Sequence, residues 1–154
     1  MQFSRTEDIE APLDAVFGAL SDFPAIERQI MRRGVEITRT DGGGAAGEGA
    51  SWRAGFRYRG KAREADVTLS RHEPPTLMVF DAVSGGLEIR TIVECVALAR
   101  TRTRVSIDAH LSAKTLSARL ILQSMKLAKG RLDRKFKTRV AQAASDLEAR
   151  LKRT

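Results

Sequence analysis

The sequence has few residues that could cross-link a fold or anchor it in a membrane. Only one of its 154 residues is a cysteine, Cys95, so no disulfide can form within the chain. This cysteine and two distant histidines, His72 and His110, cannot close a structural zinc site, and we expect neither a metal nor a cofactor. No apolar run approaches the roughly 18 residues of a membrane span, and the first residues lack a basic segment followed by an apolar one. The sequence therefore predicts a reduced, cytoplasmic protein.

Acidic residues are scarce in the last quarter of the chain. Residues 1–113 hold 15 basic and 16 acidic residues, a net charge of −1, whereas residues 114–154 hold 12 basic and 3 acidic residues, a net charge of +9. The apolar residues Leu127, Leu132, Phe136 and Val140 lie between the cations, which is typical of a basic amphipathic helix. Such a charge run is usually the solvated face of a packed helix. The alternative is contact with RNA, a ribosome or an anionic membrane; no aromatic residue alternates with the cations, and we expect no DNA binding.

Alternation of apolar and polar residues predicts a β-sheet. In residues 51–59, Trp52, Phe56 and Tyr58 share one face, while Arg53 and Arg57 share the other. Similar patterns predict strands in residues 3–9, 35–40, 65–70, 77–83, 87–98 and 102–111. Their short connections indicate an antiparallel meander. With 42% hydrophobic residues, we expect one domain, residues 1–154, with a sizeable core.

Helical spacing appears in two regions. Pro12 precedes apolar residues at positions 13, 16, 17 and 20, which predicts a helix, and a second short helix follows through Ile30. From about Thr115 the apolar residues advance by three or four, which predicts a long helix with a break near Gly130. The glycine-rich residues 42–49 contain the spacing G-x-G-x-x-G, but a strand follows them instead of a helix, so we interpret them as a hairpin loop and not a dinucleotide site.

The order strand, two helices, six strands and long helix is accompanied by recognisable segments. They are Ile9-Glu10-Ala11-Pro12, Val16-Phe17, Leu20-Ser21-Asp22-Phe23-Pro24, Gly47-Glu48-Gly49, Pro74-Pro75 and Thr103-Arg104-Val105. In this order the chain resembles the START-like (SRPBCC) superfamily, in particular its polyketide cyclase/dehydrase-like branch. The resemblance implies an α+β helix-grip fold. In this fold a curved antiparallel β-sheet of about seven strands wraps around a long C-terminal α-helix, and two short helices follow the first strand.

The resemblance also implies a cavity between the sheet and the C-terminal helix, which binds a small hydrophobic ligand such as a lipid, polyketide or quinone. Its candidate lining residues are Trp52, Phe56, Tyr58, Val67, Leu69, Phe80, Val93, Ile107, Leu120, Met125 and Phe136. Trp52 and Tyr58 each bring a polar group that could fix the orientation of a ligand. The alternative is that all eleven are ordinary core, since a packed sheet and helix need apolar faces too.

Two further functions stay open. One is an enzyme of polyketide cyclase or dehydrase type, and the other is an interaction module that docks through the basic C-terminal helix, similar to quinone-binding and ribosome-associated relatives. No catalytic set follows from the spacing of residues, so the sequence favours a binding protein. Such an enzyme would use His110 or a carboxylate in the cavity. His110 alternates with the apolar set and should face solvent with Asp108 unless a bulge turns that strand.

Four other residues receive specific predictions. His72 is expected to be exposed in the proline-rich loop, and Cys95 to be a small buried residue. Arg5 and Glu7 share the side of Phe3 on the first strand, and we expect a structural ion pair near the cavity mouth.

Overall fold

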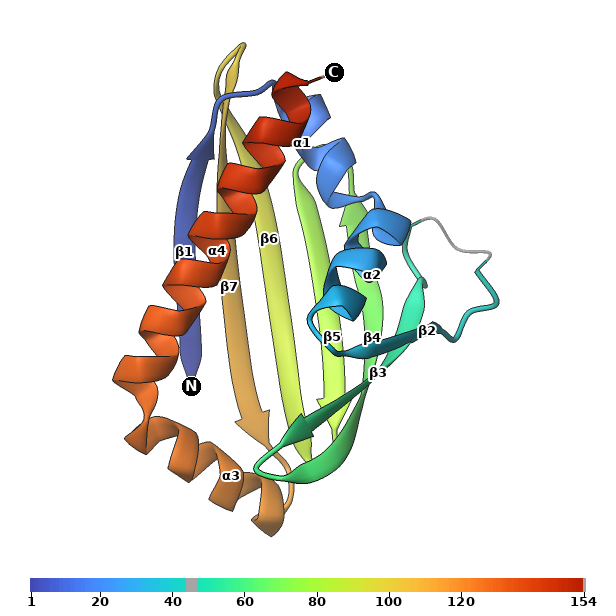
Figure 1. The fold of residues 1–154 in the computed structure, drawn as a ribbon, viewed down its shortest axis with the longest axis vertical. Coiled ribbons are helices and arrows are strands. Elements are labelled where there is room, and N and C mark those ends of the chain that lie inside the picture. The colour runs from blue at the N-terminus through green and yellow to red at the C-terminus, as the bar shows by residue number, and fades with distance from the viewer. Residues whose placement is uncertain (44–46, 154) are drawn as a thin grey trace.

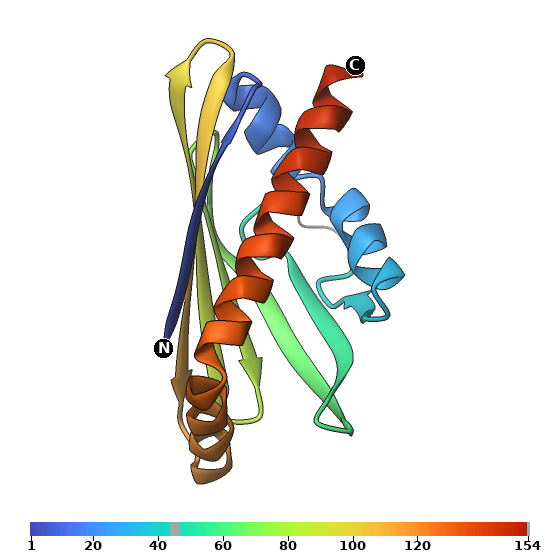
Figure 2. The same cartoon turned by 60° about the vertical axis from the view of Figure 1, so that its left-hand side comes forward.

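The computed structural model describes residues 1–43 and 47–153, which form one seven-stranded sheet with four helices (Figure 1). The glycine-rich loop predicted for residues 42–49 falls partly outside the described residues. All of the helices lie on the same side of the sheet, and the opposite side carries none of the described helices (Figure 2). We call the covered side the concave face and the other side the convex face.

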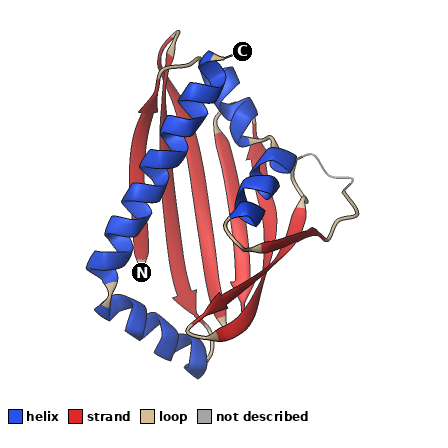
Figure 3. Cartoon of the chain, in the orientation of Figure 1, coloured by secondary structure: helices blue, strands red, loops and turns tan. Residues whose placement is uncertain are grey.

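The elements follow the predicted order (Figure 3). The strands are β1 (Gln2–Ile9), β2 (Glu36–Arg39), β3 (Ser51–Tyr58), β4 (Lys61–Glu73), β5 (Leu77–Ser84), β6 (Leu87–Ala99) and β7 (Arg102–Ala113). The helices are α1 (Leu13–Leu20), α2 (Phe23–Arg32), α3 (Leu116–Leu127) and α4 (Lys129–Lys152). The order across the sheet is β1-β7-β6-β5-β4-β3-β2, and each neighbouring pair is antiparallel. The predicted helix-grip fold is confirmed.

The predicted break in the C-terminal helix is confirmed, and it divides this segment into two helices. α3 ends at Leu127 and α4 begins at Lys129, so the break lies at Ala128, and Gly130 belongs to the first turn of α4. α4 then runs alongside β1 over the concave face, while α3 lies across the end of the sheet (Figures 1 and 2). Within the described residues, no helix is both long and apolar enough to cross a bilayer.

The main core lies at one end of the concave face. Val16 and Phe17 of α1 and Leu147 of α4 pack there with Leu69 and Cys95 from the sheet. All five are at most 8% exposed. The apolar spacing of α1 explains this arrangement, because positions 13, 16, 17 and 20 form one apolar side of the helix, which faces the sheet. We call this region the packed end.

Candidate ligand-binding hollow

The middle of the concave face is less buried than its margins. Strand register aligns Phe3, Ala109, Thr91, Phe80 and Leu69 in one row, and Leu111, Ile89, Ala82, Val67 and Trp52 in the next. The outer members of each row are buried, whereas the central members are only half-buried. Helices that filled the space over this face would bury its centre as well.

The central side chains are thus less covered than the margins, and we call the surface that they form the hollow. Its floor comprises Val67, Phe80, Ala82, Ile89, Thr91, Ile107 and Ala109, all half-buried. Only Thr91 among them carries a polar side chain. The hollow thus offers a mainly apolar surface to a ligand.

The eleven predicted lining residues fall into five groups. Val67, Phe80 and Ile107 belong to the floor of the hollow, and Trp52, Leu69 and Val93 belong to the buried core. Phe56 and Tyr58 lie half-buried on β3 near the β3–β4 hairpin. Met125 and Phe136 are half-buried on α3 and α4, and the Phe136 ring lies 5.9 Å from that of Phe3. Leu120 differs from the others, because it is 59% exposed on α3.

The polar group of Trp52 is already engaged within the protein. Its indole N–H donates a hydrogen bond to the Glu27 carboxylate at 3.0 Å. The Arg39 guanidinium lies 5.1 Å from the Trp52 ring centre and 3.7 Å from the same carboxylate. Arg39 also donates two hydrogen bonds to Asp41, which lower the pKa of that carboxyl. Trp52 therefore ties α2 to the sheet and has no indole N–H left to orient a ligand.

Tyr58 is the more available polar group. Among the described residues no hydrogen-bond partner of its hydroxyl is found, although its ring is flanked by the guanidinium groups of Arg59 and Arg63 at 5.5 and 5.6 Å. Arg59 and Gly60 both have positive φ angles, 55° and 72°, which close the two-residue β3–β4 turn. Tyr58 thus sits beside a tight, positively charged hairpin tip at the edge of the concave face.

The prediction for His72 was wrong. β4 continues to Glu73, and a register shift between Leu69 and Arg71 changes the alternation, so His72 pairs with inward-facing Met78 and is half-buried. Its ring centre lies 5.4 Å from that of Phe17, and its Nε2 lies 3.1 Å from the Ser21 hydroxyl. His72 is therefore an acid–base group on the concave face that the sequence analysis missed.

His110 lies on the opposite face of the sheet. β7 pairs with β6 without a register shift from Thr103 to Ala113, so His110 points away from the side of Ala109 and is exposed. Asp108 accepts a hydrogen bond from the Ser4 hydroxyl and not from His110. This pair therefore has no route to the hollow.

Arg5 and Glu7 lie on the concave face of β1, as their alternation with Ser4 and Thr6 predicts, and both are half-buried. The expected ion pair between them is not found among the described residues; Arg5 donates instead to the backbone carbonyl of Asp133 on α4 at 3.4 Å.

Cys95 is 1% exposed, and burial raises the pKa of its thiol to about 11. The prediction of a small buried cysteine is confirmed.

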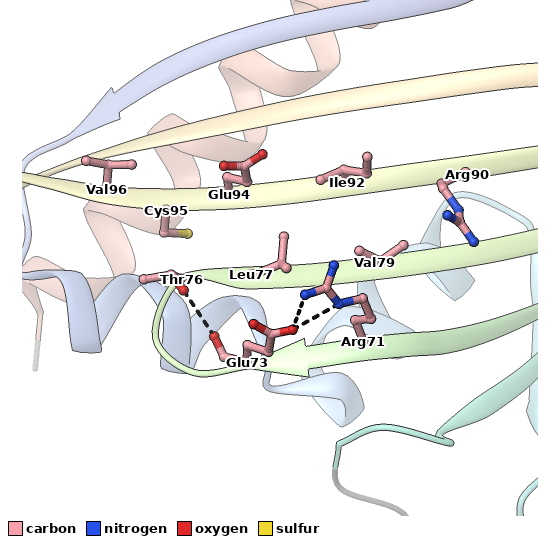
Figure 4. Close-up of a pocket in the computed structure, with 10 residues that line it drawn as sticks. All are labelled: Arg71, Glu73, Thr76, Leu77, Val79, Arg90, Ile92, Glu94, Cys95 and Val96. Carbon is pink, nitrogen blue, oxygen red and sulfur yellow. Dashed lines mark hydrogen bonds and ion pairs between the residues drawn. The ribbon is translucent and has the colours of Figure 1, made fainter.

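The convex face carries an open recess of about 440 Å³ over β4, β5 and β6 (Figure 4). Its residues are Arg71, Glu73, Thr76, Leu77, Val79, Arg90, Ile92, Glu94, Cys95 and Val96. None of the eleven predicted lining residues belongs to it. A second recess of about 490 Å³ on this face is bordered by His110. Because Arg71 pairs with Glu73, and Arg90 with Asp81, much of the charge here is already neutralised.

The basic residues of α4 are displayed to solvent. Arg134, Lys135, Lys137 and Arg139 are all exposed, which fits the solvated face of a packed helix. No contact of the described residues tests whether this helix binds RNA, a ribosome or a membrane, and that partner stays a prediction. Within residues 1–43 and 47–153, no group of three or more His, Cys, Asp or Glu side chains could hold a metal ion.

Comparison with known proteins agrees with this architecture. The family described as "Polyketide cyclase / dehydrase and lipid transport" matches residues 1–151. The chain belongs to this family. No curated protein matches it. The predicted START-like resemblance is confirmed.

Solved structures with the same fold cover almost the whole chain. A norcoclaurine synthase point mutant from Thalictrum flavum, in complex with a transition-state analogue, is 14% identical with a TM-score of 0.68, over 99% of this chain and 96% of that one. The Zhui aromatase/cyclase from Streptomyces sp. R1128 is 13% identical with a TM-score of 0.64, over 98% and 95% of the two chains. At these identities the likeness shows the helix-grip fold alone.

Proposed function

We propose that the protein binds a small, mainly apolar ligand, of the lipid, polyketide or quinone class, in the hollow. The observation that carries this proposal is the half-buried apolar floor beneath the helices. Removing apolar ligand surface from water contributes about 25 cal/mol per Å², so about 200 Å² would supply about 5 kcal/mol. The Tyr58 hydroxyl is the group we assign to orienting the ligand. The unpaired Cys95 supports a reducing, cytoplasmic setting.

Native mass spectrometry and a neutral fluorescent probe test the proposal together. We expect purified protein to retain a hydrophobic molecule, or, after delipidation, to bind N-phenyl-1-naphthylamine with saturable enhancement of fluorescence. A neutral probe is chosen because the protein carries a net charge of +8, which would attract an anionic probe non-specifically. Absence of both a retained molecule and saturable binding would contradict the proposal.

A variant that fills the hollow locates the binding site. Ala109 lies in the floor on β7, opposite Thr91, so Ala109→Phe should occupy the space that the probe needs and weaken binding about tenfold or more. Ser112→Phe is the matched control, because it adds the same ring to an exposed position three residues along the same strand, on the convex face. Equal probe affinity in the two folded variants would place the binding site elsewhere.

A second candidate function is acid–base catalysis on the bound ligand. The hydrogen bond between His72 and Ser21 favours it, because it holds an ionisable ring beside Phe17 and Phe23 at the packed end. Phe23 in turn contacts Trp52, which pairs with Val67 of the floor. His72 therefore replaces His110 as the group that would transfer a proton.

The molecules retained by wild-type protein and by His72→Gln distinguish binding from catalysis. For a dehydrase, the variant should retain a molecule heavier than the wild-type molecule by one water; for a cyclase without loss of water, the two should share a mass but differ in chromatographic retention. Identical molecules in both proteins would favour a binding protein. Probe titration of His72→Gln serves as the control that the hollow is intact.

A further inference from the structure

Three leucines of α3 are displayed to solvent in one line. Leu116, Leu120 and Leu127 are 73%, 59% and 92% exposed. Their spacing of four and seven residues places them on one side of the helix, and we call them the leucine stripe. The other side of α3 packs inward through Ala118, which is 3% exposed. A helix that is apolar on both its packed and its solvent side has a second surface without a partner.

The chain holds α3 in a fixed position. The Thr115 hydroxyl caps the helix by accepting a hydrogen bond from the Ala118 N–H at 3.2 Å. The Lys114 N–H donates to the Gly86 carbonyl at 2.8 Å, which ties the start of α3 to the turn between β5 and β6. A Cβ on Gly86 would lie 2.2 Å from the Thr115 hydroxyl oxygen, so only glycine allows this close approach. The leucine stripe is therefore presented on an anchored element.

Positive charge is concentrated at the same end of the sheet as the leucine stripe. Residues 114–132 contain five cations and no acid, and residues 57–63, at the tip of the β3–β4 hairpin, contain four cations and no acid. The strand order brings this hairpin tip, the β5–β6 turn and the start of α3 to the same end of the sheet (Figure 1). We call it the cationic end.

Most of these charges have no acidic partner. Within the described residues only Lys114 and Lys129 of the nine form ion pairs, with Glu88 at 3.6 Å and with Asp133 at 3.3 Å. The opposite end of the molecule differs, since its ion pairs join Arg102 to Glu10, Arg104 to Asp8 and Lys152 to Glu148. An interfacial helix binds an anionic lipid surface through exposed apolar side chains and through cations that have no acidic partner, and this end of the molecule has both.

We propose that the cationic end docks on the surface of an anionic lipid bilayer, with the leucine stripe inserted among the lipids. RNA would match the charge but would leave the leucines in water. A second copy of the chain would match the leucines but would bring nine cations against nine. An anionic bilayer satisfies both features. The docking is independent of the proposed ligand binding, although the hollow approaches this end through Phe56 and Tyr58.

Vesicle flotation tests the proposal with the full chain and no added apolar ligand. We expect binding to vesicles of phosphatidylcholine with phosphatidylserine, little binding to phosphatidylcholine alone, and loss of binding as salt is raised. Flotation reports attachment to the vesicle and probe titration reports occupation of the hollow, so failure of docking and failure of ligand binding are measured separately.

Two double variants separate the contribution of the leucine stripe to vesicle binding from that of the charge. Leu120→Ser with Leu127→Ser should weaken binding to the anionic vesicles roughly 100-fold, at about tenfold for each leucine. The matched control is Val96→Ser with Leu98→Ser, which removes two exposed apolar residues of β6 that are 54% and 43% exposed. Arg119→Glu with Lys126→Glu should abolish binding, whereas the same charge reversal at Lys137 and Arg139 of α4 should reduce it less.

Several results would overturn the proposal. Full vesicle binding by folded Leu120→Ser with Leu127→Ser would show that charge alone attracts the protein. An equal loss of vesicle binding in the control Val96→Ser with Leu98→Ser would contradict a specific role of α3. Salt-sensitive RNA binding without vesicle binding would assign the cations to nucleic acid. A dimer that the serine variant dissociates, again without vesicle binding, would assign the stripe to a second copy. Thermal unfolding of each variant confirms that it is folded.

Discussion

The two halves of the concave face are built from the same strands but packed differently. Leu69 at the packed end is fully buried, whereas Val67, two residues earlier on the same side of β4, is half-buried in the hollow. Burial falls in the same way on β7, where Val105 is buried and Ile107 is half-buried. α1 and the end of α4 close one half, and neither fills the other. We therefore expect stability to be concentrated at the end away from the hairpin, while the hollow is the place of the proposed ligand.

The largest effect is expected at the packed end. Leu69→Ala should lower the free energy of unfolding by about 3 kcal/mol, because it leaves a cavity among fully packed neighbours. Val67→Ala, on the same face of the same strand, should cost less than half as much. Urea unfolding of both variants measures the difference. Equal losses would mean that the hollow is packed in solution.

A smaller loss of stability is expected when Phe80, a large side chain of the hollow, is truncated. Phe80→Ala removes a ring that contacts Trp52, yet it should cost only about 1 to 2 kcal/mol, since that ring is half-buried. Urea unfolding in the absence of ligand is again the measurement. A loss in the free energy of unfolding larger than that of Leu69→Ala would contradict the difference in packing between the two halves.

The smallest effect concerns acid stability at the packed end. The Glu148 carboxylate accepts a hydrogen bond from the Glu10 N–H at 2.8 Å and pairs with Lys152, and these contacts lower its pKa below the ordinary 4.5. A lowered pKa in the folded state stabilises the fold above pH 4.5, and this contribution disappears as the pH falls through the lowered value. Glu148→Gln should therefore be less stable than wild type near neutral pH and equal to it in strong acid.

Urea midpoints at neutral pH and in strong acid give the measurement, with Asp146→Asn on the same helix as the control. A stability difference between Glu148→Gln and wild type that persists unchanged in strong acid would rule out titration of this carboxyl as its cause.

The sequence predicts the fold well because alternation is a local property. The period of two in residues 52–58 assigns Trp52, Phe56 and Tyr58 to one face, and β3 has that arrangement. The same reasoning places His110 on the convex face. Where a strand has no register shift, counting residues is enough to orient its side chains.

The candidate site was harder to predict because it depends on tertiary packing. The register shift after Leu69 reverses the alternation, and the prolines at positions 74 and 75 made His72 look like a loop residue. The broken alternation from Ser70 to His72 was the available signal. Leu120 lies on a helix with apolar residues on several sides, and periodicity alone does not tell which side the sheet covers. The partner of the Trp52 indole comes from α2, 25 residues away in sequence.

The short strand β2 limits how the sheet can grow. It is the outermost strand beyond β3 and spans only four residues, Glu36–Arg39, with Glu36 and Thr38 exposed. So short an edge offers few free backbone groups to a strand of another molecule. The Glu36 carboxylate on β2 also disfavours close approach of such a strand. Edge-to-edge pairing of two copies through β2 is thereby discouraged, which leaves the eight-residue β1 as the longer edge of the open sheet.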